Sequence, residues 1–177
     1  MFWQENAFGV LSVNERQIVQ TSDDTTLMLG TGDVLQRFDY ITTEYGMNDN
    51  EFVDAQGGGR LFWWDHDKKE LLSYTGNSLT PLTLRKGLLS YVRNAEIKDN
   101  PTIMYDDKYH EVVANVIKDE SLVFNTELDV FTAIYDLAFD TSLSFDSYSI
   151  LTKGSQAMRW NTSYGNEAKI FGNPIYP

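Results

Sequence analysis

The sequence reads Phe62-Trp63-Trp64-Asp65 at the start of its most regular region. The same order, an apolar residue, any residue, an aromatic residue and then Asp or Asn, returns at residues 103–106, 122–125 and 158–161. Residues two apart point to the same face of a β-strand, so the apolar and aromatic positions of each segment share one face. Each segment is therefore predicted to be a strand with one strongly apolar side.

The Asp or Asn that ends each segment is predicted to open a turn, because its side chain hydrogen-bonds backbone groups about two residues further on. These predicted hairpin-tip residues are Asp65, Asp106, Asn125 and Asn161. After the first two, a Glu and two apolar residues begin a returning strand, which covers residues 70–74 in the first case. In the third unit the matching segment, Asp129-Val130-Phe131, begins one residue closer to the turn-opening Asn than in the first two units. In the fourth unit the returning strand is expected only at Ile170-Phe171, after a longer loop.

An isolated hairpin is marginally stable in water, so the predicted hairpins must pack on one another. Stacks of small antiparallel sheets are typical of a β-propeller or a related sandwich. Leu84, Leu88, Tyr91 and Val92 recur at helical spacing and predict a short helix within the first repeat. The predicted fold is mainly β, with antiparallel hairpins stacked as a complete or incomplete β-propeller-like domain and one or two short helices.

The glycine run Gly57-Gly58-Gly59 is the clearest break along the chain. We interpret it as a loop that joins an N-terminal segment, residues 1–56, to a hairpin-repeat domain, residues 57–177. The N-terminal segment is expected to pack on the β-domain. Neither this run nor Gly30-Thr31-Gly32 is followed by the Lys-Ser/Thr pair of a phosphate-binding loop, so tight turns are the preferred interpretation.

Composition argues against several classes of protein. The 26 acidic and 14 basic residues give a formal net charge of −12, which repels nucleic acid, because DNA affinity comes mostly from Lys and Arg. The chain has no cysteine, so disulfides and thiolate metal sites are excluded. No apolar run approaches the roughly 18 residues of a membrane helix. The N-terminus shows neither the basic nor the apolar region of a signal peptide.

The sequence offers no recognisable catalytic constellation. The two histidines, His66 and His110, fall in matching predicted tips, where a polar turn residue is a simpler interpretation than a metal ligand. The Gly-x-Ser-x-Gly pattern of a nucleophile elbow is missing, and nothing singles out two carboxylates for a hydrolase. We therefore predict a protein that is not an enzyme and has no catalytic, cofactor-binding or metal-binding residues.

Trp63 has two interpretations, because strand alternation places it opposite Phe62 and Trp64. An exposed Trp63 would stack on sugar rings, which would make the chain a receptor- or glycan-binding module. A buried Trp63 would anchor one sheet or one subunit to another, and large aromatic residues more often pack than wait for a ligand. We prefer the second interpretation, with Trp3 as a further anchor.

The N-terminal region carries a resemblance to a known family. It reads Ala7-Phe8-Gly9-Val10-Leu11-Ser12-Val13-Asn14-Glu15-Arg16 and later Leu27-Met28-Leu29-Gly30-Thr31-Gly32. The hairpin segment Met104-Tyr105-Asp106 to Glu111-Val112 follows. This arrangement resembles the propeller-like part of tail nozzle proteins of short-tailed bacteriophages, which include the muzzle proteins of crAss-like phages. The resemblance extends from about Trp3 to Gly172.

The resemblance implies a structural role in a phage tail. Copies of the protein would form a ring, usually of six, that seals or lines the channel through which the genome leaves. Other tail proteins would dock on the ring, and DNA would pass without specific binding. The implied location is the virion, after synthesis in the cytoplasm of the bacterial host. Known members are several times longer and carry this region well inside the chain, which leaves two interpretations open, a fragment of a longer protein or the product of a split reading frame.

Overall fold

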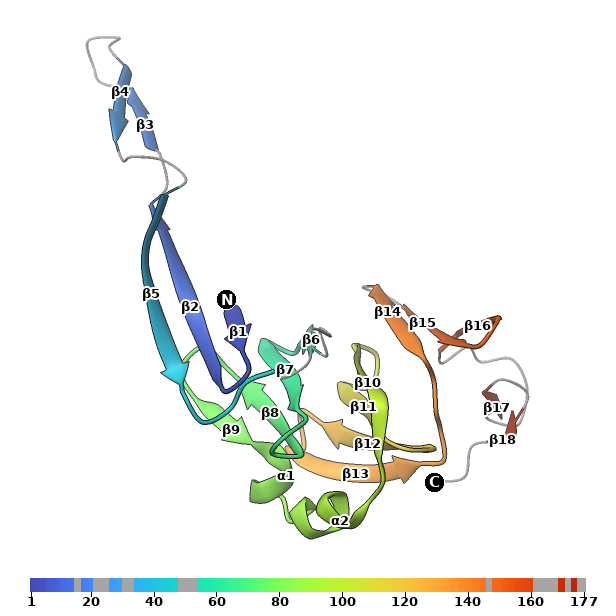
Figure 1. Ribbon diagram of the computed structural model, residues 1–177. Helices are drawn as coiled ribbons and strands as arrows, with labels where there is room; N and C mark the ends of the chain where they lie inside the picture. The colour runs from blue at the N-terminus through green and yellow to red at the C-terminus, as the bar shows by residue number, and fades with distance from the viewer. Residues whose placement is uncertain are drawn as a thin grey trace. The chain divides into compact units, whose positions relative to one another are not determined.

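The structure is a computed structural model, in which the chain forms two compact units, Met1–Asp49 and Asn50–Pro177. The described residues are 1–14, 17–20, 26–29, 34–47, 54–145, 148–160, 169–170 and 173–174. Their secondary structure is almost entirely antiparallel β-sheet with two short helices (Figure 1). This confirms the predicted class, mainly β with antiparallel hairpins and two short helices.

The first unit contains a three-stranded antiparallel sheet in the order β1-β2-β5 and a separate hairpin, β3-β4. The strands are β1 (Phe2–Gln4), β2 (Ala7–Asn14), β3 (Gln17–Gln20), β4 (Thr26–Leu29) and β5 (Val34–Thr42). The long strands β2 and β5 pair along most of their length, as Figure 1 shows. Two register shifts interrupt this pairing, which is the mark of β-bulges.

The second unit contains three larger sheets, in each of which every strand pairs antiparallel with the next along the chain. The first sheet holds β6 (Asp54–Gly57), β7 (Arg60–Asp65), β8 (Glu70–Tyr74) and β9 (Leu79–Pro81). The second holds β10 (Ile97–Asp106), β11 (Glu111–Ile117), β12 (Glu120–Asn125) and β13 (Val130–Tyr135). The third holds β14 (Thr141–Phe145), β15 (Tyr148–Lys153) and β16 (Gln156–Arg159), and β17 (Lys169–Ile170) and β18 (Asn173–Pro174) form a separate pair.

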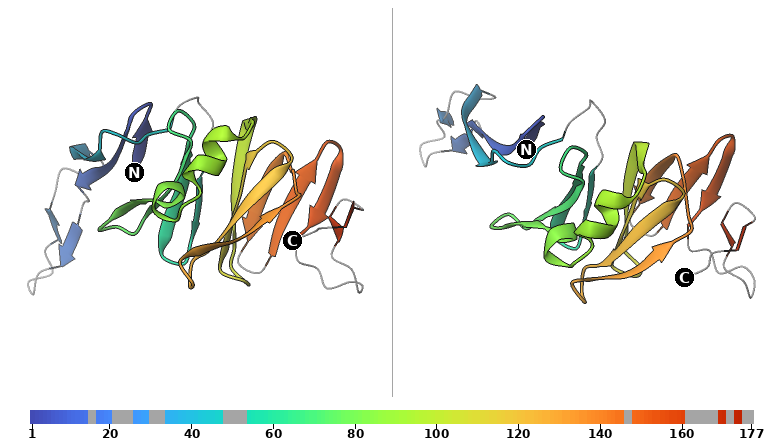
Figure 2. Two further views of the ribbon diagram at one scale, coloured as in Figure 1. Left: turned by 90° about the horizontal axis from the view of Figure 1, so that it is seen from below. Right: turned by 60° about the horizontal axis from the view of Figure 1, so that its bottom comes forward.

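The three sheets of the second unit stand one behind another in chain order (Figure 2). Their side chains form two buried clusters, one between the first and second sheets and one between the second and third. The second sheet is buried on both faces, since neighbouring residues on one strand enter different clusters. Val112 and Phe124 belong to the first cluster, while Val113 and Val123 belong to the second.

Gly57 sets how closely the first and second sheets approach. A Cβ atom built on this residue would lie 1.9 Å from Cδ1 of Tyr105, so any side chain would displace the Tyr105 ring. Phe62 stacks on the same ring at a centroid distance of 6.5 Å. The glycine run therefore lies inside the β-body, where Gly57 ends β6 and Gly58 and Gly59 form the turn to β7.

The predicted helical segment consists of two short helices, α1 (Leu82–Arg85) and α2 (Leu89–Asn94). Gly87 lies between them with a φ of +83°, a backbone conformation that other residues rarely adopt. Leu82 and Val92, one from each helix, are buried in the cluster between the first two sheets. The helices thus cover part of the core while they connect β9 to β10.

Candidate functional site

Three of the four predicted tip residues lie in the described structure and open their turns through hydrogen bonds to backbone N–H groups. Oδ1 of Asp65 accepts from Lys68 N at 2.9 Å, and Oδ1 of Asp106 accepts from Lys108 N at 2.9 Å. Oδ1 of Asn125 accepts from the backbone N–H groups of residues 127 and 128 at 3.1 and 2.9 Å. The fourth predicted tip, Asn161, lies outside the described residues.

The three tips have the same length and register. The strand-end pairs are Asp65 with Glu70, Asp106 with Glu111 and Asn125 with Val130. The residue before each returning strand has a positive φ, which is 53° at Lys69, 54° at His110 and 56° at Asp129. The expectation that the third returning strand starts one residue early is therefore wrong, because Val130, and not Asp129, occupies the place of the Glu.

Asp106 joins the second sheet to the third. It is only 6% exposed, and its Oδ2 accepts a hydrogen bond of 2.6 Å from Nε1 of Trp160, which follows β16. Trp160 itself is buried in the cluster between these two sheets. One carboxylate thus holds its own turn and the neighbouring sheet at once.

Asp129 joins the second sheet to the first. Its carboxylate forms ion pairs with Arg60 at 3.1 Å and with Lys86, which follows α1. The hydrogen bond from Lys86 holds the pKa of Asp129 below its ordinary value, and the bond from Arg60 acts in the same direction. The tip of the third hairpin therefore serves as an electrostatic link between sheets.

The predicted anchor Trp63 is 0% exposed in the centre of β7, so it offers no face on which a sugar ring could stack. All neighbours of Trp63 on β7 from Leu61 to Asp65 are buried as well, so both faces of this strand are covered. The second predicted anchor, Trp3, is half-buried in β1, and its ring lies 5.3 Å from that of Phe8. Whether either residue anchors one subunit to another stays a prediction.

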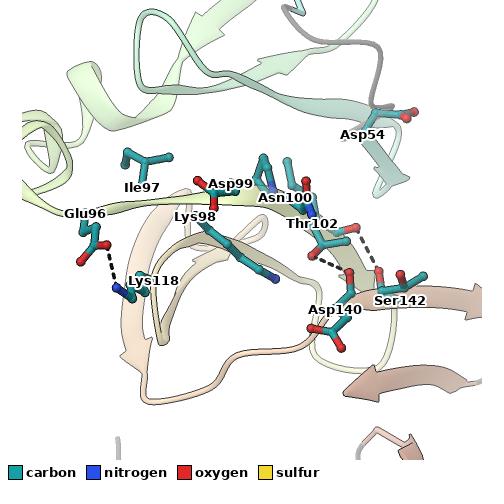
Figure 3. A pocket seen from close by; sticks show the side chains of 13 residues that line it. Asp54, Glu96, Ile97, Lys98, Asp99, Asn100, Thr102, Lys118, Asp140 and Ser142 are labelled. Atoms are coloured by element: carbon teal, nitrogen blue, oxygen red, sulfur yellow. Dashed lines mark hydrogen bonds and ion pairs between the residues drawn. The ribbon is translucent and has the colours of Figure 1, made fainter. Parts of the chain in front are cut away.

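A pocket of about 750 Å³ opens where the first strands of the three sheets begin (Figure 3). Asp54 of β6 lies across it from Asp140 and Ser142, while Lys98 and Thr102 of β10 lie between them. Two of these strands are tied together here, since Thr102 Oγ1 of β10 donates to the carbonyl of Asp140, just before β14, at 3.4 Å, and Ser142 Oγ of β14 donates to the carbonyl of Ile103 at 3.2 Å.

The charges of this pocket are mixed and partly neutralised within the pocket. The Lys98 ammonium donates to the carbonyl of Phe139, and burial lowers the pKa of Lys98. Burial raises the pKa of Asp54. At the other end, Lys118 pairs with Glu96 at 2.6 Å. Carboxylates, amines and hydroxyls of this kind hold strands in place, and none of the described pairs has the nucleophile-and-base arrangement of a hydrolase.

The histidines also lie apart from any described metal-ligand set. His110 Nε2 is 3.5 Å from Oε1 of Glu127 on the adjacent tip. Among the residues that the structure describes, no three His, Asp or Glu side chains come together as metal ligands. None of the helices in that part of the chain could span a bilayer.

Sequence reasoning missed the pocket and both links between sheets. The pocket combines the beginnings of three strands that are far apart in the sequence, and no motif marks them. Trp160 is the aromatic residue of the fourth repeat at residues 158–161, yet its partner Asp106 is 54 residues away in the sequence. The one signal in the sequence was the repeat itself, because equivalent residues of stacked units are brought close together.

The second unit is a stack of antiparallel meander sheets that is fixed by turn carboxylates and buried aromatic residues, so its fold class is mainly β. In the comparison with known families, residues 1–153 match the model of the Crassvirus muzzle protein. The chain belongs to the Crassvirus muzzle protein family, which makes it a viral structural protein of crAss-like bacteriophages. The comparison with curated proteins finds no match.

Proposed function

We propose that the chain forms part of a ring in the phage tail, where copies of it surround the genome-exit channel and other tail proteins dock on them. The observation that carries the proposal is the family match over residues 1–153. The name of the family describes a muzzle, a part at the end of a barrel, and a closed ring of copies is the simplest architecture for such a part.

The stacked sheets support this proposal. Two serine side chains of β14 donate hydrogen bonds to the backbone of β10, Ser142 to the carbonyl of Ile103 and Ser144 to that of Tyr105. The residue numbers rise together along the two strands. Strands β10 and β14 therefore run in the same direction, as the first strands of successive propeller blades do. Gly57, at the end of β6, lies against Tyr105, at the end of β10. We infer that the three sheets are successive blades of a β-propeller-like domain.

The charge of the chain supports passage of DNA without binding. A net charge of −12 gives a surface that repels phosphates, so DNA would slide past rather than adhere. Several described cations are engaged by carboxylates or carbonyls, as Lys86, Lys98 and Lys118 show. This repulsion would be strongest at low ionic strength, because salt screens it.

The proposal is tested on purified phage particles. Antibodies against the chain, detected by gold labelling in the electron microscope, are expected to mark the tail and not the capsid. Mass spectrometry of the same particles should find several copies of the protein per particle. Labelling of the capsid surface alone, or loss of the protein from particles during purification, would reject the proposed location.

A further inference from the structure

One face of the first unit is an exposed apolar surface. The register of β1, β2 and β5 places its residues on the same side, since Phe2 lies opposite Gly9, Leu11 opposite Phe38, and Val13 opposite Leu35. We call this surface the first-unit face and define it as Phe2, Gly9, Leu11, Val13, Leu35, Phe38 and Tyr40. Its larger members are 45–55% exposed, namely Leu11, Val13, Leu35, Phe38 and Tyr40.

The aromatic end of this face is ordered by its own contacts. Phe2, Phe38 and Tyr40 pack edge-to-face, with centroid distances of 6.4, 5.6 and 5.8 Å. The Phe2 ring also lies so close to Gly9 that a Cβ atom there would be 2.5 Å from Cζ of Phe2. The surface is therefore preformed by contacts within the chain itself. Large exposed apolar patches of this kind mark interaction sites.

A second exposed apolar surface lies on the outer side of the third sheet. Ser142 and Ser144 of β14 point back to β10, so the residues between and after them, Leu143 and Phe145, point away from it. We call this surface the third-sheet face and define it as Leu143, Phe145, Tyr148, Ile150 and Arg159. Leu143 pairs with Ile150, and Ile150 pairs with Arg159.

The third-sheet face also combines aromatic packing with a cation. Phe145 stacks on Tyr148 at 4.8 Å, and the guanidinium of Arg159 lies 4.3 Å from the Tyr148 ring centre. Leu143 is 55% exposed and Phe145 is 49% exposed. On the inner face of the same sheet, Leu151 is fully buried in the cluster with the second sheet. The outer face has the composition of a sheet that packs on another sheet.

Chemistry makes the two faces complementary. Neither contains an Asp or a Glu, although the chain carries 26 acidic residues. The third-sheet face is cationic through Arg159, while the first-unit face ends in three aromatic rings, whose π-faces attract a guanidinium. Within the second unit, sheets already pack face to face through side chains of this kind.

We propose that the first-unit face of one copy packs against the third-sheet face of the next copy. This head-to-tail contact rests on the ring proposed above and names the surfaces that build it. Because the two faces differ, every copy offers one of each, and such heterologous contacts generate a closed ring when the rotation between copies closes. The partner of each apolar face is thus a second copy of this chain.

Two charge substitutions test the contact, with mass photometry of the purified full chain as the readout. Phe38→Glu places a negative charge in the first-unit face, and Phe145→Glu places one in the third-sheet face. Both side chains are about half exposed, so each variant is expected to fold, which circular dichroism and thermal melting verify. Leu128→Glu is the matched control, since Leu128 is 67% exposed and lies on neither face. The control is expected to assemble like the unmodified chain.

Each face variant alone is expected to be monomeric where the unmodified chain forms rings. An equimolar mixture of the two is expected to give dimers and nothing larger, because the Phe38→Glu copy keeps its third-sheet face and the Phe145→Glu copy keeps its first-unit face. Rings of normal size from either variant would overturn the face assignment and leave the ring itself standing. Monomeric variants whose mixture stays monomeric would overturn the head-to-tail pairing. An unmodified chain that is monomeric at every concentration would overturn the ring as well.

Discussion

The Asp106 carboxylate serves two sheets at once. Its Oδ1 accepts hydrogen bonds from Lys108 N at 2.9 Å and Tyr109 N at 3.4 Å, which hold the turn between β10 and β11. Its Oδ2 accepts from Trp160 Nε1 at 2.6 Å, across the cluster that the second and third sheets share. A buried donor without its acceptor is costly, so this residue couples turn geometry to sheet packing.

Asp106→Ala is expected to lower the free energy of unfolding by about 2–3 kcal/mol, because it leaves a buried indole N–H and the turn N–H groups without their acceptor. Asp107→Ala is the matched control, since Asp107 is exposed on the same tip and should change the value by less than about 0.5 kcal/mol. Urea denaturation of the two variants and the unmodified chain measures the difference. Equal effects of the two substitutions would contradict the role given to Asp106.

Asp129 gives the fold a pH dependence of known sign. Lys86 and Arg60 hold the pKa of Asp129 below its ordinary value of 3.8, so the ion pairs stabilise the fold above that value and lose this contribution as the pH falls. Asp129→Asn keeps a residue that tolerates the positive φ and removes the charge. The variant is expected to be less stable than the unmodified chain at pH 6, and the gap should close as the pH falls below the ordinary carboxyl pKa of 3.8 and through the lowered pKa of Asp129.

Denaturation curves of both proteins across this range supply the test. Burial raises the pKa of Glu70 and of Glu111, so these groups stabilise the fold at low pH and oppose it as the pH rises. Both carboxyls are present in the variant and in the unmodified chain, so their contributions cancel in the difference. A gap that stays constant with pH would show that Asp129 acts by its shape and not by its charge.

The hairpin is the element that the sequence predicted best. The turn residues Asp65, Asp106 and Asn125 and the returning strand at residues 70–74 lie where the pattern placed them, because turn chemistry depends on local side-chain hydrogen bonds. The register predicted for the third hairpin is wrong, because Asp129 shares with Glu70 only an acidic side chain followed by two apolar residues, while Val130 pairs with Asn125. Backbone geometry decides instead, and Asp129 occupies the positive-φ position before the returning strand.

Lys69 tests this shared turn geometry. Its φ of 53° favours glycine, so Lys69→Gly is expected to raise the free energy of unfolding by roughly 0.5 kcal/mol once the added freedom of the unfolded chain is counted. Lys68→Gly changes the neighbour on the same tip, whose φ is not positive, and is expected to lower stability by a similar amount. Thermal melting of the two variants and the unmodified chain measures these changes. A loss of stability in both variants would refute the assignment of Lys69 to the positive-φ position of the turn.

The contacts between strands of different sheets could not be predicted from the sequence. The pocket at the starts of β6, β10 and β14 joins Asp54, Thr102 and Asp140, which no periodicity relates. The bond from Trp160 to Asp106 spans two sheets and depends on how they stack. Local rules specify hairpins, whereas the order and spacing of stacked sheets arise from packing, and Gly57 against Tyr105 is one example.

At the scale of the whole molecule, the chain is acidic, the three sheets of its second unit enclose two buried clusters, and two apolar surfaces, the first-unit face and the third-sheet face, stay exposed. The chain belongs to the Crassvirus muzzle protein family, whose members are viral structural proteins. We propose that the net charge of −12 keeps the genome from adhering, while the open faces join one copy to the next.

The most direct test of the ring is a cryo-electron microscopy map of the tail in intact phage particles, at a resolution that separates β-strands. The account predicts a closed ring of copies around the channel, in which the third sheet of each copy lies against the β2–β5 ribbon of the next. A tail in which this chain is absent, or is present as single copies with both surfaces facing solvent, would contradict it.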